Sequence, residues 1–214
     1  MSADFEKLRR EYKQKFLDEK NMHPDPIVQF GEWFRLAVDV GIDLPNAMVL
    51  ATASNEGKPA ARFVLLKDYD KNGFVFYTHS VSAKGRQLEK NPQAALIFYW
   101  SNLDRQVRIE GKAERTSDRE ADEYFASRPH DSRISAWAAP QSSVIKNREY
   151  LESRVEEFRQ KFGDGDVPRP EDWVGYRVIP VAVEFWQGRE NRLHDRILYT
   201  LCNGGRWNIS RLAP

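Results

Sequence analysis

The stretch AMVLATAS (47–54), NEGKP (55–59) and AARFVLLKDYD (60–70) decides the fold class of this chain. Apolar and polar residues alternate with a period of two on both sides of a turn that contains glycine. This alternation is typical of two neighbouring antiparallel strands. The stretch therefore predicts a hairpin in the middle of the chain.

Further strand-like segments follow the hairpin: GFVFYT (73–78), QAALIFYW (93–100) and RQVRIEGKAERT (105–116). Together with the hairpin they give five strands that are joined mainly by short turns. We expect an antiparallel barrel or sandwich from this arrangement. Two final strands and a hairpin at NGG are expected near the C-terminus: 176–188, 193–203 and 206–214.

Segments with helical spacing flank these strands: 23–41, 82–92, 117–129 and 147–163. Ser117 and Glu120 have the spacing of a capping box. A charged helix is expected from Asp4 to Glu19. The fold class is thus mainly β with flanking helices, in which residues 1–20 form a mobile N-terminal lid and residues 21–214 a single domain.

Composition excludes several classes of protein. The 214 residues carry a formal net charge of +1, so the chain lacks the broad basic field of nonspecific nucleic-acid binding. No apolar run approaches the roughly 18 residues that span a bilayer, and the charged N-terminus is unlike a signal peptide. We expect a cytoplasmic protein. Cys202 is the single cysteine, which excludes an intramolecular disulfide.

Common cofactor motifs are also missing. The four histidines are dispersed and lack metal-ligand spacing, so no metal site is expected. The chain has neither a Gly-rich phosphate loop nor a GxSxG elbow. A nucleotide-type cofactor would therefore be held by side chains.

Three segments offer such side chains, and each also has a purely structural interpretation. Arg62 and Lys67 of RFVLLK are either ligand contacts or cations whose stems cover a strand. SAKGRQ (82–87) is either a phosphate site at a helix start or an ordinary capped helix. YFASRPHDS (124–132) could hold a phosphate monoester through tyrosine, arginine and serine, or could be a plain helix terminus.

The segment WQGRENRLHDR (186–196) concentrates positive charge. If a strand begins here, Arg192, His194 and Arg196 alternate onto one face, which favours a ligand site over a structural histidine. Asp195 would face away and pair elsewhere. Arg189 is interpreted as solvated surface.

These segments occur together and in order in one family. From LRREY (8–12) to the terminal RLAP (211–214), the chain resembles the pyridoxine (pyridoxamine) 5′-phosphate oxidases, and RFVLLK, RQVRIEGKAER, YFASRPHDS, QSS and EFWQGRENRLHDR carry the resemblance. The resemblance implies an FMN-binding split β-barrel that works as a homodimer, with FMN at the subunit interface. It also implies oxidation of pyridoxine 5′-phosphate and pyridoxamine 5′-phosphate by O2 to pyridoxal 5′-phosphate and H2O2. No nucleic-acid or membrane partner is expected.

The resemblance also assigns site residues. The cofactor contacts that it implies are Arg62, Phe63, Val64, Leu65, Leu66, Lys67, Tyr77, Thr78, Lys84, Gln106, Gln141, Ser142, Trp186 and Arg196. The substrate contacts that it implies are Arg9, Arg10, Glu11, Tyr12, Lys67, Tyr124, Arg128, Ser132, Arg192, Leu193 and His194. Of these, Arg192 and His194 are the implied catalytic pair. The first four belong to the segment that closes over the substrate.

One departure concerns FMN affinity. The best-known members have Ser-Arg-Lys where this chain has Ser82-Ala83-Lys84. The loss of one charge-assisted hydrogen bond, about 1.5–3 kcal/mol, would weaken binding. Helix geometry does not place Arg86 on the same face as a replacement. Alternatives to the oxidase are another split-barrel FMN reductase and a non-catalytic carrier of flavin or pyridoxal phosphate.

Overall fold

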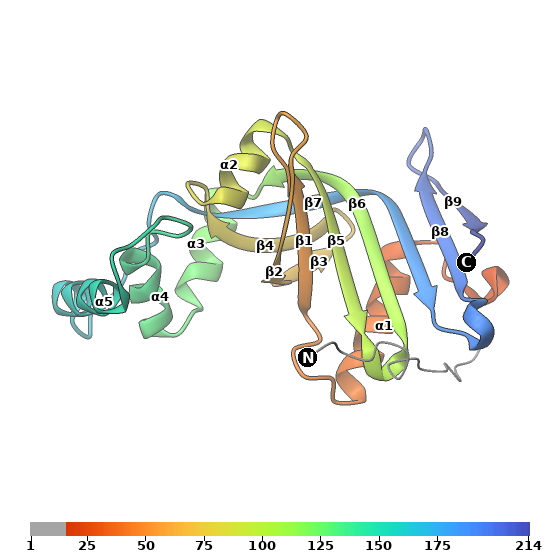
Figure 1. The fold of residues 1–214 in the computed structure, drawn as a ribbon, viewed down its shortest axis with the longest axis horizontal. Helices are drawn as coiled ribbons and strands as arrows, with labels where there is room; N and C mark the ends of the chain where they lie inside the picture. The colour runs from red at the N-terminus through yellow and green to blue at the C-terminus, as the bar shows by residue number, and fades with distance from the viewer. Residues whose placement is uncertain (1–15) are drawn as a thin grey trace, which may run out of the picture.

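The computed structural model describes residues 16–214, which build one antiparallel sheet of nine strands flanked by helices (Figure 1). The strands are β1 (Ala47–Ala53), β2 (Pro59–Leu65), β3 (Asp68–Asp70), β4 (Gly73–His79), β5 (Gln93–Trp100), β6 (Arg105–Arg115), β7 (Trp173–Gln187), β8 (Asp195–Leu201) and β9 (Trp207–Arg211). Their order is β2–β1–β5–β6–β7–β4–β3, with β8 on β7 and β9 on β8. The predicted mainly β, antiparallel fold with flanking helices is confirmed.

The long strand β7 organises the sheet. One of its edges pairs with β6, whereas its other edge is shared, with residues 173–178 on β4 and residues 182–187 on β8. The change of partner coincides with a register shift between Glu110 and Gly111, where Pro180 of β7 has no N–H to donate. A Cβ at Gly111 would collide with the carbonyl oxygen of Ile179. Two arms of the sheet therefore leave the same edge of β7.

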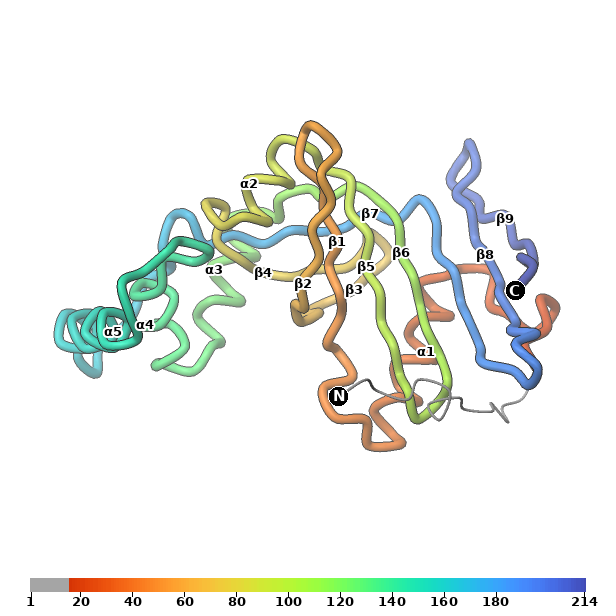
Figure 2. Tube along the Cα trace, viewed as in Figure 1, coloured from red at the N-terminus to blue at the C-terminus, as the bar shows by residue number. Residues whose placement is uncertain are grey.

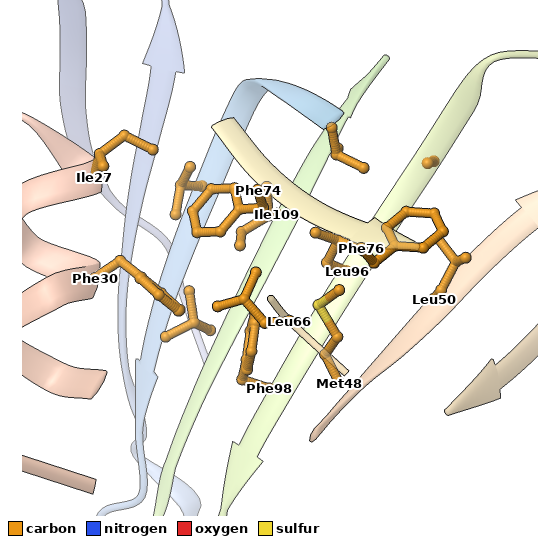
Figure 3. Packing of buried hydrophobic residues seen from close by; sticks show 14 of the residues in the cluster. Ile27, Phe30, Met48, Leu50, Leu66, Phe74, Phe76, Leu96, Phe98 and Ile109 are labelled. Carbon is orange, nitrogen blue, oxygen red and sulfur yellow. The ribbon is translucent and has the colours of Figure 1, made fainter. Parts of the chain in front are cut away.

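Helix α1 covers the core face of the sheet. The helices are α1 (Pro26–Asp39), α2 (Ala83–Lys90), α3 (Asp118–Ala126), α4 (His130–Ala138) and α5 (Arg148–Phe162), with short 3-10 turns at Glu19–Asn21, Ser101–Leu103 and Glu190–Arg192. The Asp25 carboxylate caps α1, and Pro26 occupies its first turn. Phe30 is fully buried, with its ring centroid 4.9 Å from that of Phe74 and 5.0 Å from that of Phe98 (Figure 3).

Helices α3, α4 and α5 gather at one end of the sheet, away from β8 and β9 (Figures 1 and 2). Ile134, Phe158 and Val167 form a small core between α4 and α5. The ring of Phe125 in α3 meets the ring of Trp173 in β7 edge-on at 4.9 Å, which ties α3 to the sheet. The predicted capping box of α3 is present.

Two predicted boundaries are wrong. The segment 60–70 is not one strand, because β2 ends at Leu65 and Leu66 turns into the core before β3 begins at Asp68. Helix α4 was not expected, since Pro129 was interpreted as the end of a helix; Pro129 instead stands directly before a new helix, without a side-chain capping hydrogen bond. The charged helix predicted up to Glu19 falls mostly outside the described residues. Within residues 16–214, no helix combines the length and the apolar character needed to cross a membrane.

Candidate active site

A cavity of about 430 Å³ lies where the ends of β2 and β4 meet α3 and α4. Its lining includes four of the residues that the resemblance assigns to the substrate: Lys67, Tyr124, Arg128 and Ser132. Lys67 is also a predicted cofactor contact, and four more such contacts line the cavity: Leu65, Tyr77, Thr78 and Gln141. Folding thus brings together two sets of residues that lie far apart in the sequence.

Arg128 gives the cavity a half-buried cation. It follows α3, and its guanidinium lies 5.0 Å from the centroid of the Trp173 ring and 5.3 Å from that of Phe125. Its buried Nη1 atom has no hydrogen-bond partner among residues 16–214, and burial lowers the pKa of the guanidinium. A buried donor of this kind is normally satisfied, so this end of the cavity suits an anion.

Stacked aromatic rings fix the tyrosines of the cavity. The ring of Tyr77 lies parallel to Tyr124 at 4.2 Å and to Trp173 at 5.0 Å. The Tyr77 hydroxyl donates to the carbonyl oxygen of Glu120 at 3.4 Å. Burial and the negative charge of Glu120 raise the pKa of Tyr77 to about 12, so the hydroxyl keeps its proton at neutral pH.

Lys84 forms a second cationic group at the start of α2. Its Nζ donates to Thr78 Oγ1 at 3.2 Å and to Gln141 Oε1 at 2.8 Å. Burial, followed by the charge of Arg62, lowers the pKa of Lys84. Ser82 caps the helix by accepting from the Gly85 N–H, and a Cβ at Gly85 would collide with the carbonyl oxygen of Ser80.

Arg62 completes this group from β2. Its Nη1 donates to Thr52 Oγ1 at 2.6 Å and its Nη2 to Gln87 Oε1 at 3.2 Å. Within the described part of the chain, the polar partners of Arg62 and Lys84 are neutral oxygens, and no carboxylate pairs with either cation. Two cations left without a counter-ion fit the phosphate of a mononucleotide.

The sequence departure at Ala83 leaves an exposed first residue on α2. Arg86 does not replace the missing arginine, because its guanidinium folds back onto the carbonyl oxygen of Val81. Ser142, another predicted contact, adopts a left-handed backbone with φ of 68°. Such a conformation is uncommon for a residue other than glycine and clusters at functional positions.

The strand register separates the predicted cofactor contacts onto two faces of the sheet. Arg62 pairs with Leu50, which belongs to the core face. Gln106 pairs with Tyr99 and Trp186, and Trp186 pairs with Arg196, all on the opposite face. Phe63 and Tyr99 are exposed on that outer face, and Phe63 is 78% exposed. One chain therefore presents two partial sites.

His194 lies beside Trp186 at the edge of the outer face. Their ring centroids are 4.7 Å apart at an angle of 45°. His194 Nδ1 accepts a hydrogen bond from the backbone N–H of Arg189 at 3.1 Å. Burial and the charge of Arg192 lower the pKa of His194.

The predicted alternation of Arg192, His194 and Arg196 on one strand face is wrong. Strand β8 begins only at Asp195, and Arg192 lies in the preceding 3-10 turn with φ of 59°. Arg196 instead forms a forked pair with Glu184, from Nε to Oε1 at 2.7 Å and from Nη2 to Oε2 at 3.2 Å.

Arg189 is not solvated surface, as the sequence suggested. Its guanidinium covers the ring of Phe16 at 3.6 Å, its Nε lies 3.7 Å from Asp195 Oδ2, and its side chain is 18% exposed. Asp195 pairs away from the outer face as expected, since its Oδ1 accepts from Arg211 Nη1 at 2.6 Å. The loop that carries Arg192 and His194 is thus held in place by charge pairs.

The remaining predicted residues differ in their surroundings. The side chain of Leu66 belongs to the core, Val64 packs against the core, and Leu193 is exposed. Arg9, Arg10, Glu11 and Tyr12 lie outside the described residues. Sequence reasoning missed Gln87, Trp173 and Glu184. Gln87 could have been found, because it follows Lys84 by one helical turn on α2.

Comparisons with known proteins show the family of this chain. Residues 37–162 match the family profile of pyridoxamine 5′-phosphate oxidase, and residues 173–214 match the pyridoxine 5′-phosphate oxidase C-terminal dimerisation region. A pyridoxine/pyridoxamine 5′-phosphate oxidase of Nostoc sp. is 51% identical over 207 residues, which is 97% of each chain. A protein of the same name from Burkholderia mallei is 52% identical over 209 residues, again 97% of each chain.

Two solved structures share the fold. PhzG from Burkholderia lata 383, in complex with tetrahydrophenazine-1-carboxylic acid, is 30% identical with a TM-score of 0.89, covering 96% of this chain and all of its own. A pyridoxamine 5′-phosphate oxidase-related, FMN binding protein from Nostoc punctiforme has a TM-score of 0.71 at 18% identity, over 90% of this chain and 100% of its own. The first similarity extends to sequence, and the second concerns the fold alone. By its family profile and its relatives of about half identical sequence, the chain belongs to the pyridoxine/pyridoxamine 5′-phosphate oxidase family of oxidoreductases, with the split-barrel fold.

Proposed function

We propose that this chain is an FMN-dependent oxidase of pyridoxine 5′-phosphate and pyridoxamine 5′-phosphate. The alcohol or amine loses two hydrogens, and O2 gains them as H2O2. The product is pyridoxal 5′-phosphate, and water releases ammonia in the case of the amine. Bound FMN would supply the two-electron oxidation and the reaction with O2, while the protein supplies position and electrostatics.

The observation that carries this proposal is the half-buried guanidinium of Arg128 at the wall of the 430 Å³ cavity, whose buried Nη1 has no hydrogen-bond partner among residues 16–214. Lys67, Tyr124 and Ser132 line the same cavity, so two cations and two hydroxyls surround one space. Together they match the charge and the acceptor oxygens of a phosphate monoester. A clamp on the phosphate would fix the substrate in one position, which lowers the barrier of the following step.

The second cationic group provides the proposed FMN phosphate site. Arg62 and Lys84 donate only to neutral oxygens among the described residues, and Lys84 lies beside Gln141 and Thr78 of the cavity wall. A phosphate dianion would relieve the repulsion between the two cations. Ser82 holds the start of α2 in place through its cap and thereby sets the position of Lys84.

The proposed working form is a homodimer. Gln106, Trp186 and Arg196 share the outer face of the sheet with the exposed Phe63 and Tyr99. A second copy on this face would bury the apolar residues and bring the outer-face contacts of one subunit to the Arg62 and Lys84 group of the other. The match of residues 173–214 to a dimerisation region supports this arrangement.

Arg192 and His194 are the proposed contacts to the pyridine ring. Arg192 would confine the ring, and His194 would hydrogen-bond one of its substituents. His194 cannot accept a proton at Nδ1 while that atom accepts the Arg189 N–H. We therefore assign it the role of a hydrogen-bond donor through Nε2 rather than that of a base.

Anaerobic titration with pyridoxine 5′-phosphate tests the proposal. The purified protein, loaded with FMN, should lose its flavin absorbance in proportion to added substrate and regain it with O2. Aldehyde and H2O2 should form in equal amounts. A yellow protein that never bleaches with either B6 phosphate would instead be a carrier.

The likeness to PhzG raises a second candidate, oxidation of a reduced phenazine carboxylic acid. The carboxylate of such a substrate could pair with Arg128, but two cations and two hydroxyls around one space match the charge and the acceptor oxygens of a phosphate monoester better, which favours the B6 phosphates. The two B6 phosphates and tetrahydrophenazine-1-carboxylic acid should be compared as reductants of the bound flavin. Faster bleaching by the phenazine precursor would overturn the assignment.

A further inference from the structure

Glu184 is a buried carboxylate in the middle of the outer face of β7. Its side chain is 4% exposed, and it pairs in register with Arg108 of β6 and Leu198 of β8. Burial of an ionised carboxylate is unfavourable unless hydrogen bonds and opposite charges compensate. Glu184 meets this condition through two arginines, so its charge is retained inside the sheet.

The two arginines use the carboxylate differently. Arg196 grips it with a fork, in which Nε and Nη2 reach separate oxygens. Arg108 reaches only Oε2, at 2.8 Å from its Nη2, and also lies 3.4 Å from Glu110 Oε1. Arg108 therefore lies near two carboxylates, those of Glu184 and Glu110. Among residues 16–214, Arg196 pairs with the carboxylate of Glu184 alone.

A second contact restrains Arg196 from the chain end. Its Nη1 donates to the carbonyl oxygen of Ala213 at 3.0 Å. Each of the three guanidinium nitrogens of Arg196 therefore has a partner before any ligand binds. Planar donors held in this way lose less freedom on binding than a mobile arginine would.

We propose that Glu184 is a positioning residue that orients Arg196 toward the flavin. The inference rests on the proposed function, in which Arg196 contacts FMN. Glu184 itself does not need to touch the cofactor. Its fork selects one orientation of the guanidinium, and its charge compensates the burial of the positive charge that the fork holds.

The substitution Glu184→Gln separates positioning from simple packing. It keeps the shape of the side chain but removes the charge and one of the two acceptor oxygens. Glu110→Gln is the matched control, because Glu110 also lies beside Arg108 but is 49% exposed and makes no contact with Arg196 in the described structure. Glu184→Asp keeps the negative charge but shortens the side chain. It therefore disturbs the two hydrogen bonds to Arg196 without removing the charge.

The measurement is the dissociation constant of FMN, obtained by quenching of flavin fluorescence as apoprotein is added. We expect Glu184→Gln and Glu184→Asp to weaken FMN binding about tenfold in the natural background. In a protein that already carries Arg196→Ala, the same changes should raise the dissociation constant of FMN by no more than about twofold, because the effects of coupled residues are not additive. Glu110→Gln should leave the constant within about twofold of the unchanged protein.

Equal weakening in both backgrounds, or none in either, would overturn the role of Glu184. Should Glu184→Gln fail to fold by circular dichroism, Glu184→Asp and Arg196→Lys carry the test, since lysine cannot form the fork. Arg196→Lys should then bind FMN as weakly as Arg196→Ala. If Arg196→Ala itself binds FMN normally, the positioning role fails, whereas bleaching by pyridoxine 5′-phosphate still decides the proposed function separately.

Discussion

The backbone N–H of Arg189 donates a hydrogen bond to Nδ1 of His194 at 3.1 Å. A backbone amide can only donate, so Nδ1 must carry a lone pair and the proton of the neutral ring resides on Nε2. Burial and the charge of Arg192 also lower the pKa of His194. We therefore expect His194 to be neutral at pH 7 in the Nε2–H form.

Nitrogen-15 spectra of protein labelled at histidine check this expectation. The signals of His194 are those that disappear in His194→Gln, and their shifts should report an unprotonated Nδ1. Because the pKa is lowered, the midpoint of protonation should lie below the ordinary histidine value of 6.5. A ring that carries a proton on Nδ1 at pH 7 would contradict the assignment and reopen the role of His194 as a base.

Arg128→Ala should raise KM for pyridoxine 5′-phosphate by one to two orders of magnitude. The lost contacts to a charged phosphate correspond to about 1.5–3 kcal/mol. Arg119→Ala is the matched control, because Arg119 lies on α3, the helix that Arg128 follows, with its side chain 82% exposed. Binding of the unphosphorylated alcohol should be equally weak in both variants. A KM that Arg128→Ala leaves unchanged would move the phosphate site elsewhere.

Lys84 should make FMN affinity fall as the pH rises toward the ordinary lysine value of 10.5, and the fall should begin earlier than for an ordinary lysine. Burial and Arg62 lower the pKa of Lys84, so the ammonium loses its proton at a lower pH than an ordinary lysine. Loss of that charge removes attraction for the phosphate. Titrations of apoprotein should show a smaller fall for Lys84→Arg, and a weak, pH-independent affinity for Lys84→Met. Parallel curves for the natural protein and Lys84→Arg would exclude Lys84 as the titrating group.

The turn before β8 holds backbone strain that can be measured. Asn191 has φ of 54°, and Arg192 follows with φ of 59°. Asparagine tolerates this left-handed region, whereas a β-branched residue does not. Asn191→Val should lower the free energy of unfolding by about 1–2 kcal/mol in urea titrations. Asn208→Val, at an exposed position of β9, is the control and should change it by less than about 0.5 kcal/mol.

Local patterns predicted most elements but not the geometry of the site. The period-two segments gave the strands, and Ser117 with Glu120 gave the start of α3. Helix α4 was not predicted, because a proline that follows one helix can also stand directly before the next, as Pro129 does. The prediction that Arg192 and Arg196 share one strand face was wrong, because the sequence Asn191-Arg192 does not predict two consecutive residues with a left-handed backbone.

The pairing of distant residues was also beyond local patterns. Glu184 looked like one polar residue in an apolar strand, and only the register of three strands sets it between Arg108 and Arg196. The same register places Arg62 and Trp186 on opposite faces of the sheet. The family resemblance identified Arg62 and Trp186 as cofactor contacts, but their division into two partial sites follows from the pairing of the strands.

The two partial sites predict that two defective chains repair each other. Lys84 belongs to the cationic group at α2, and Arg196 belongs to the outer face. If each complete site takes one group from each subunit, a dimer of a Lys84→Ala chain with an Arg196→Ala chain has one site with both defects and one site with neither. Each variant alone has no intact site.

Mixing the two variants under conditions of subunit exchange should therefore restore activity. Random pairing makes half of the dimers mixed, each with one intact site of two, so the mixture should reach about a quarter of the activity of the unchanged protein. A mixture of Lys84→Ala with Arg62→Ala is the control, because both residues belong to the same partial site and no intact site can form. No activity in the first mixture would mean that each chain builds its site alone. Activity in the control would mean that Arg62 and Lys84 do not belong to the same partial site.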